Sequence, residues 1–248
     1  MISKVFIDIN CDVGEGIGNE RALFPHISSC NIACGGHAGD VNTMFEIVQL
    51  ARKFAIKVGA HPSYPDRENF GRKSMKIEKG LLISSIQKQI KELEATLISS
   101  EMQLHHIKAH GALYNDIAGD LELAVIYLES VLAYKDKVLL YLPYGSAIEK
   151  EARKQGFKIA LEAFGDRNYN DDLSLVSRDS AQALIEDPKK VLEHLISMAI
   201  NKEVVTLNGV KVPILADTFC IHGDTSTALQ ILMYLTDQLP KQHIFLRK

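Results

Sequence analysis

The feature that most constrains the fold is a repeated alternation of short apolar runs with longer segments of helical spacing. Seven β-prone apolar runs occur along the chain: KVFIDIN, NIAC, IKVGAH, LHHIKAH, KVLLYLP, FKIALEAF and ILADTFCIH. Segments whose apolar residues recur at helical spacing accompany them, at residues 41–55, 78–100, 120–133, 188–200 and 225–239. Strands that alternate with helices in this way predict a parallel sheet joined by helical crossovers. In the second helical segment, one apolar stripe is expected from Leu81, Ile86, Ile90, Leu93 and Leu97.

The length of 248 residues suits closure of this sheet. Seven or eight strand–helix units, closed into a barrel, occupy about 200 to 250 residues. We therefore predict α/β architecture, with a single TIM-like (β/α) barrel domain over residues 1–248 and about seven parallel strands. An open doubly wound sheet is the competing topology. Asn208 and Gly209 lie between two β-prone runs and favour a type I′ turn, which predicts a hairpin insertion near residues 203–214, before the last strand.

Composition excludes several classes of function. Lysine and arginine number 28 against 31 aspartates and glutamates, so the chain lacks the excess positive charge typical of nucleic-acid binding. No apolar run reaches the roughly 18 residues that cross a bilayer, and the first ten residues lack the apolar stretch of a signal peptide. We expect a cytoplasmic protein that binds neither nucleic acid nor membrane. Four cysteines in a chain of this size indicate buried thiols rather than a disulfide scaffold.

Ionisable residues follow the apolar part of most predicted strands. In a parallel barrel, the carboxyl ends of the strands and the loops after them converge on one mouth, where active sites form. The residues that this geometry brings to the mouth are Asn10, Asp12, Cys34, His37, His61, Lys108, His110, Glu162, Asp166, Arg167, His222 and Asp224. Four of the nine histidines belong to this set, which predicts a single catalytic or ligand-binding site.

Strand parity predicts that the barrel lumen is polar. Side chains two residues apart on a strand share a face, so Asp8, Asn10 and Asp12 point away from the apolar residues between them. Lys108 and His110 share a face on the fourth strand by the same rule. If the apolar residues pack under the helices, the charged ones enter the lumen. Buried charge is costly, so these groups must pair with one another, bind a metal or meet a ligand.

The loops carry weaker signals. The segments GEGIG and CGGHAGD let backbone amides approach a ligand closely, although neither has the spacing of a phosphate or dinucleotide loop. Asp40 fits the N-cap of the following helix, whose positive end suits an anion. The segment HPSYPDR is a stiff turn that carries His61 and Arg67. Tyr114 and Asn115 follow the fourth strand and are candidates for orienting a substrate.

Six segments together carry a family resemblance: NCDVGEG, NIACGGHAGD, GAHPSYPDRENFGR, IKAHGALYN, FGDRNY and CIHGD. In this order, from about Asp8 to about Asp224, they resemble the LamB/YcsF family. The resemblance implies a TIM-like barrel similar to those of glycoside hydrolases and deacetylases. It also implies the role of the A subunit of prokaryotic 5-oxoprolinase. With its B and C subunits, that enzyme hydrolyses the lactam 5-oxo-L-proline (pyroglutamate) to L-glutamate, using ATP, accompanied by Mg²⁺, as co-substrate.

This reaction assigns expected roles to the residues at the mouth. Asp12, with His61 or His110, is the expected general base and general acid, and Lys108 is expected to stabilise a phosphoryl or oxyanion charge. A bidentate clamp for the substrate carboxylate is expected from Arg67 or Arg72. The other candidates for substrate binding are Asn10, His37, Asp40, Tyr114, Glu162, Asp166, Arg167, His222 and Asp224.

Three alternatives stay open at this point. A metal-dependent deacetylase or amidohydrolase would take its ligands from Asp12, His61, His110 and His222. A thiol nucleophile would be Cys34 or Cys220. A non-catalytic subunit would use the same cavity only to bind a small anion for a partner enzyme.

Overall fold

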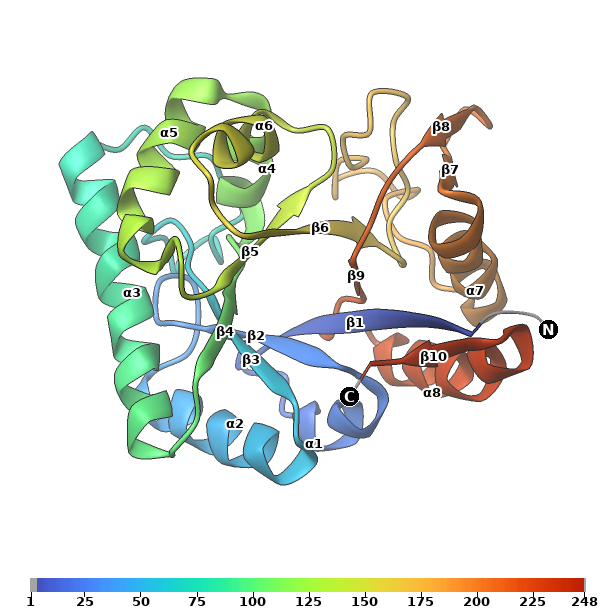
Figure 1. Ribbon diagram of the computed structural model, residues 1–248, viewed down its shortest axis with the longest axis horizontal. Coiled ribbons are helices and arrows are strands. Elements are labelled where there is room, and N and C mark those ends of the chain that lie inside the picture. The colour runs from blue at the N-terminus through green and yellow to red at the C-terminus, as the bar shows by residue number, and fades with distance from the viewer. Residues whose placement is uncertain (1–3, 248) are drawn as a thin grey trace.

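The computed structural model describes residues 4–247, so the outermost positions of the predicted domain, residues 1–3 and 248, lie outside the described residues. Seven parallel strands close into a barrel, and helices surround it (Figure 1). In order around the barrel the strands are β1 (Val5–Val13), β2 (Ser29–Ala33), β3 (Lys57–His61), β4 (Leu104–Ile107), β5 (Leu139–Pro143), β6 (Ile159–Phe164) and β9 (Thr218–Cys220). Because β9 also pairs with β1, the ring is closed. The predicted TIM-like barrel is confirmed, and the open sheet is excluded.

Helices and helical turns form the outer layer. They are α1 (Glu20–Leu23), η1 (Phe24–His26), α2 (Val41–Phe54), α3 (Lys79–Ser99), α4 (Gly111–Gly119), α5 (Leu121–Ser130), η2 (Leu132–Tyr134), α6 (Ala147–Lys154), α7 (Pro188–Ile196), η3 (Ser197–Asn201), α8 (Ala228–Gln238) and η4 (Leu239–Gln242). The predicted stripe of α3 is wrong at its first position, because Leu81 is 61% exposed and Leu82 is buried. Leu82 precedes Ile86 by four residues, which places these two side chains on the same helix face.

Two short elements lie outside the ring. β10 (Ile244–Leu246) pairs in parallel with the first residues of β1. β7 (Glu203–Val205) and β8 (Lys211–Pro213) form an antiparallel hairpin between η3 and β9. Its turn is not type I′, because that type needs positive φ at both central residues and only Gly209, not Asn208, has it. The turn closes through a hydrogen bond from the Gly209 amide to the Thr206 carbonyl.

The interior of the barrel is polar, as parity predicts. Asp8 accepts hydrogen bonds from the hydroxyls of Ser29 (2.7 Å) and Thr218 (2.6 Å). Two residues further along β1, Asn10 donates to Glu162 Oε1 (2.9 Å) and to the Thr218 hydroxyl (2.8 Å). The apolar residues between them are buried in the hydrophobic core. Each of these buried polar groups therefore finds its partner on another strand.

Gly59 on β3 makes room for a large side chain in the lumen. A Cβ at this position would overlap the ring of His106, which donates to Asn31 Oδ1 (2.6 Å) and stacks on Tyr141. We expect Gly59→Ala to lower the free energy of unfolding by about 1–3 kcal/mol, because the locked ring cannot move aside. Urea denaturation followed by circular dichroism measures this change. Gly119→Ala is the matched control, since a Cβ there meets no atom within 4 Å, and equal stability of the two variants would contradict the argument.

Two further expectations concern the membrane and the thiols. Across residues 4–247, no helix combines the length and the hydropathy that crossing a membrane requires. All four cysteines are free and buried, as predicted.

Candidate active site

The four predicted catalytic residues lie together at the carboxyl ends of the strands. Asp12 stands near the end of β1 and His61 ends β3, while Lys108 directly follows β4 and His110 is the N-cap of α4. Two backbone hydrogen bonds hold the segment after β4 beside β3. The Lys108 amide donates to the Ala60 carbonyl, and the His110 amide donates to the carbonyl of Pro62, which directly follows β3. Asp12 Oδ1 lies 3.0 Å from Lys108 Nζ, and Asp12 Oδ2 lies 3.4 Å from His61 Nε2. Residues from positions 12 to 110 thus converge on one point.

Lys108 is a buried cation between two carboxylates. Its Nζ lies 3.0 Å from Asp12 Oδ1, 3.0 Å from Glu162 Oε1 and 3.2 Å from Cys220 Sγ. Burial disfavours its charge, but the carboxylates of Asp12 and Glu162 raise the pKa of Lys108 well above its ordinary value. Burial likewise opposes ionisation of Asp12, yet the neighbouring His61 and Lys108 hold the pKa of that carboxyl well below its usual range. At neutral pH the site holds a lysine ammonium and an aspartate carboxylate.

His61 and His110 face each other through fixed ring nitrogens. Nδ1 of His61 lies 2.9 Å from the Lys108 carbonyl, and Nε2 of His110 lies 2.9 Å from the Phe70 carbonyl. Because a carbonyl oxygen only accepts, both of these nitrogens carry a hydrogen. The remaining nitrogens, Nε2 of His61 and Nδ1 of His110, are 3.0 Å apart. This 3.0 Å contact can be bridged by one shared proton or by a bound cation.

Glu15 and His37 complete this side of the mouth. Glu15 Oε1 lies 3.2 Å from Nε2 of His37 and 3.4 Å from Nδ1 of His110. His37 stacks face to face on His110, with ring centroids 3.5 Å apart. Burial, with the charge of Asp12, raises the pKa of Glu15 to about 7, and burial, with the nearby His61, lowers the pKa of His37 to about 2. His37 is therefore a neutral hydrogen-bonding group.

Sequence reasoning missed Glu15. The GEGIG segment drew attention only for its backbone, although a carboxylate flanked by two glycines three residues after Asp12 is a usable signal. Gly14 and Gly16 both have positive φ, which bends the chain sharply after β1. This bend returns the Glu15 side chain to the mouth.

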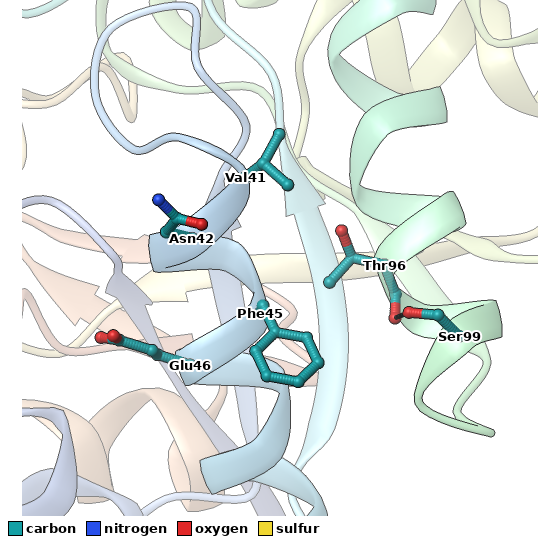
Figure 2. A pocket seen from close by; sticks show the side chains of 6 residues that line it. All are labelled: Val41, Asn42, Phe45, Glu46, Thr96 and Ser99. Carbon is teal, nitrogen blue, oxygen red and sulfur yellow. Dashed lines mark hydrogen bonds between the residues drawn. The ribbon is translucent and has the colours of Figure 1, made fainter.

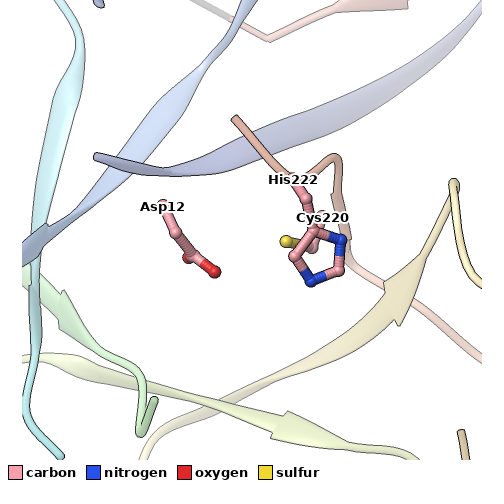
Figure 3. A group of neighbouring side chains, drawn as sticks. All are labelled: Asp12, Cys220 and His222. Atoms are coloured by element: carbon pink, nitrogen blue, oxygen red, sulfur yellow. The ribbon is translucent and has the colours of Figure 1, made fainter. Parts of the chain in front are cut away.

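His222 and Asp166 form a second pair at the mouth. The Asp166 carboxylate accepts from the backbone amide of His222 (2.8 Å) and from its Nδ1 (2.9 Å). These hydrogen bonds fix the orientation of the His222 ring, and Nε2 is the ring nitrogen that does not contact Asp166. Figure 3 shows His222 and Cys220 facing Asp12, and ligand atoms of these three residues lie within 4.8 Å of one another.

The arginines take unequal positions. Arg67 is committed to the backbone, since its NH1 donates to the carbonyls of Gly35 (3.1 Å) and Gly39 (3.0 Å). Arg72 instead pairs with Asp224 at 2.6 Å, and its side chain is 40% exposed. Arg178 lies 3.8 Å from the same carboxylate oxygen and was not predicted from the sequence. Two guanidinium groups against one carboxylate leave positive charge for an anion.

Two other predicted residues, Arg167 and Asp40, are held by contacts outside this cluster, whereas Tyr114 borders it. Arg167 donates to the carbonyls of Ala183 (3.2 Å) and Val176 (2.6 Å) and so holds the loop after β6. Asp40 caps α2 by accepting from the Thr43 amide at 2.8 Å. Tyr114 is buried on α4 with its ring edge against Phe164, the ring that also stacks on His222. Burial, with the charge of Glu162, raises the pKa of Tyr114 well above its ordinary value.

The cysteines nearest the mouth are poor nucleophiles. Burial raises the pKa of Cys34 to about 12, and burial raises the pKa of Cys220 well above its ordinary value despite the adjacent Lys108. Cys34 also donates its hydrogen to the Ile32 carbonyl at 2.9 Å. Since the thiolate is the reactive form, neither side chain favours covalent catalysis.

A groove on the outer surface has few ionisable residues, unlike the barrel mouth. It lies between α2 and α3, has a volume of about 380 Å³ and is shown in Figure 2. Its lining is Val41, Asn42, Phe45, Glu46, Thr96 and Ser99. Glu46 is the single ionisable residue in this lining, whereas the barrel mouth brings together several ionisable groups with shifted pKa values, so the mouth is the candidate active site.

Comparison with known proteins agrees with this architecture. The family model described as LamB/YcsF matches residues 7–248. The chain belongs to the LamB/YcsF family. A relative from Acinetobacter baumannii, named as the A subunit of 5-oxoprolinase, is 38% identical over 248 residues, with 98% of each chain covered. A relative of the same name from Pyrococcus furiosus is 36% identical over 243 residues, with 96% of this chain and 95% of that one covered.

A solved structure shares the fold across its whole length. The crystal structure of a lactam utilization protein from Thermus thermophilus superposes with a TM-score of 0.91 and 34% identity, over 98% of this chain and 99% of that one. The family resemblance predicted from the six sequence segments is therefore confirmed.

Proposed function

We infer that this LamB/YcsF chain is the A subunit of an ATP-dependent 5-oxoprolinase that opens the ring of 5-oxo-L-proline to give L-glutamate. The observation that carries this proposal is the match, over nearly the whole chain, to relatives named as the A subunit of 5-oxoprolinase. A mouth lined by Asp12, Lys108 and several imidazoles is the chemical equipment that hydrolysis of an amide needs. The coarse conclusion, a lactam-related role, also agrees with the name of the Thermus structure.

The reaction must overcome amide resonance. Phosphorylation of the lactam oxygen by ATP gives an imidate phosphate, and addition of water to its carbon gives a tetrahedral adduct. Breaking the ring C–N bond of that adduct, with a proton delivered to the nitrogen, leaves the amine of glutamate and an acyl phosphate. A second water converts the acyl phosphate to carboxylate and phosphate. Two waters and one ATP are consumed for each glutamate.

The geometry suggests a division of roles. Asp12, ionised and adjacent to His61, takes a proton from the attacking water, and His61 and His110 complete this water-activating side. Lys108, fixed by Asp12 and Glu162, stabilises the developing negative charge. His222 is oriented by Asp166 and delivers a proton to the ring nitrogen.

Substrate recognition falls to the rim of the mouth. Arg72 is the better candidate for the substrate carboxylate, because Arg67 is already bonded to two backbone carbonyls. Among the other predicted binding residues, Asn10 and Glu162 contact Nζ of Lys108 and hold it in place. His37 and Asp224 border the mouth through their contacts with Glu15 and Arg72. We place the site for ATP and its Mg²⁺ at a surface completed by the B or C subunit, since the chain has no recognisable phosphate loop.

Reconstitution tests the proposal. The purified chain should release glutamate from 5-oxoproline and ATP only when the B and C subunits are both present, and it should show no substantial activity alone. Glutamate and ADP are measured in parallel, with L-proline, which lacks the ring carbonyl, as the control substrate. Pyroglutamate-dependent ATP hydrolysis by the isolated chain would contradict the division of labour, and a complete complex that releases no glutamate would contradict the function.

A further inference from the structure

The facing nitrogens of His61 and His110 have the surroundings of metal ligands. Each ring donates its outer N–H to a backbone carbonyl, from His61 to Lys108 and from His110 to Phe70, at 2.9 Å in both cases. Histidines that bind metals almost always donate their other ring nitrogen in this manner, which fixes the ring and the tautomer. When no proton is shared between them, the inner nitrogens, 3.0 Å apart, present two lone pairs to one small space.

A carboxylate stands beside the same space. Glu15 Oε1 is 3.4 Å from Nδ1 of His110, and one ligand atom each from Glu15, His61 and His110 lie within 4.8 Å of one another. Two ligand atoms that are each about 2.0–2.1 Å from a tetrahedral ion lie about 3.3 Å apart. The separations of 3.0 Å between the imidazoles and 3.4 Å from Glu15 to His110 lie on either side of that value, and the third pair, Glu15 and His61, lies within 4.8 Å.

The three side chains are also held in place before any ion arrives. They are only 1% to 6% exposed. His37 packs against His110 on one side and contacts Glu15 through Nε2 at 3.2 Å, so it supports both.

We propose that Glu15, His61 and His110 bind one divalent metal ion of the zinc type at the barrel mouth. Imidazole nitrogens with one carboxylate suit Zn²⁺ and Co²⁺, whereas Mg²⁺ and Ca²⁺ prefer oxygen ligands alone. The ion takes the place of the proton that the two facing nitrogens would otherwise share.

The site itself rests on geometry, and its role rests on the proposed function. An ion with three protein ligands keeps a coordination position for water and lowers the pKa of that water. Asp12, 3.4 Å from His61 Nε2 and not one of the three ligands, is placed to receive a proton. His61 and His110 then activate water through the ion.

Metal binding to the isolated chain tests the inference without turnover. Chelator-treated protein is titrated with Zn²⁺ by calorimetry and with Co²⁺ by visible absorption. We expect one ion per chain, intense tetrahedral Co²⁺ bands, and a loss of affinity of at least about 100-fold in Glu15→Gln and in His110→Ala. Zn²⁺ should raise the melting temperature of the wild type and not that of Glu15→Gln, which keeps the shape of the side chain.

Matched variants locate the ion. His105 lies before the mouth on β4, with Nδ1 3.0 Å from His106 Nδ1, so His105→Ala removes a histidine from an equally close pair and should leave affinity unchanged. Cys220→Ser tests the other candidate group, formed by Asp12, Cys220 and His222. Weakened binding in Cys220→Ser with normal binding in Glu15→Gln would overturn the proposal.

The result separates this inference from the function. Absence of bound Zn²⁺ and Co²⁺ in the wild type would mean that a shared proton fills the gap, and the metal site would be wrong even in an active complex. Tight binding that depends on Glu15, in a complex that releases no glutamate, would uphold the site and reject the function.

Discussion

Asp12→Asn should lower glutamate release by the assembled enzyme by at least about 1,000-fold, the scale of a lost general base. Asparagine has nearly the same shape but cannot take a proton from water. The fold should persist, because Lys108 keeps its second carboxylate, Glu162, at 3.0 Å. Steady-state assays of the complex measure the loss, and circular dichroism of the variant verifies that its fold is intact.

Asp8→Asn is the matched control for this prediction. Asp8 is on the same strand and faces the same lumen four residues earlier, but its Oδ1 accepts from the hydroxyls of Ser29 and Thr218. Its substitution should therefore leave turnover within a few-fold of the wild type. Near-normal turnover in Asp12→Asn, or an equal loss in both variants, would remove Asp12 from the catalytic role.

Lys108→Met should lower the free energy of unfolding by about 3–5 kcal/mol, the range for removing one partner of a buried ion pair. The ammonium neutralises both Asp12 and Glu162 in the lumen, and a methionine would leave two buried carboxylates without a cation between them. Urea denaturation at neutral pH measures the change. Activity should be lost as well, since the same ammonium is proposed to stabilise developing negative charge.

Two comparisons make this prediction specific. Lys88→Met removes an exposed lysine 3.8 Å from Glu92 and should leave stability unchanged within error, since exposed pairs contribute little. Adding Glu162→Gln to Lys108→Met should restore part of the lost stability, because it removes one of the two uncompensated charges. Equal stability of Lys108→Met and Lys88→Met would show that the buried pair is unimportant.

Part of the site was predictable because strand parity is a local property. Alternation along β1 places Asn10 and Asp12 in the lumen wherever the strand packs with its apolar face outward. Parallel strands present their carboxyl ends at one mouth, so His61 and His110 were expected at the same end of the barrel. The sequence segments that carry the family resemblance contain these same residues, including Asp12, His61 and His110.

Other parts depended on contacts that no local pattern contains. Arg67 and Arg167 have the chemistry of anion-binding residues, but the folded loops direct them to backbone carbonyls. Glu15 enters the mouth only because two glycines with positive φ turn the chain back. The prediction of a type I′ turn at Asn208 and Gly209 was wrong for a related reason. The turn is closed by a hydrogen bond from the Gly209 amide to the Thr206 carbonyl, and a dipeptide pattern does not specify that bond.

The sequence by itself determined the alternation of strands and helices, the polar lumen and the identity of most residues at the mouth, because side-chain periodicity and the direction of parallel strands are set by neighbours in the chain. The tertiary structure alone decided that β9 closes the ring on β1 and that the inner nitrogens of His61 and His110 stand 3.0 Å apart. These features depend on register between distant strands and on hydrogen bonds to carbonyls of other loops, which form only when the whole barrel packs.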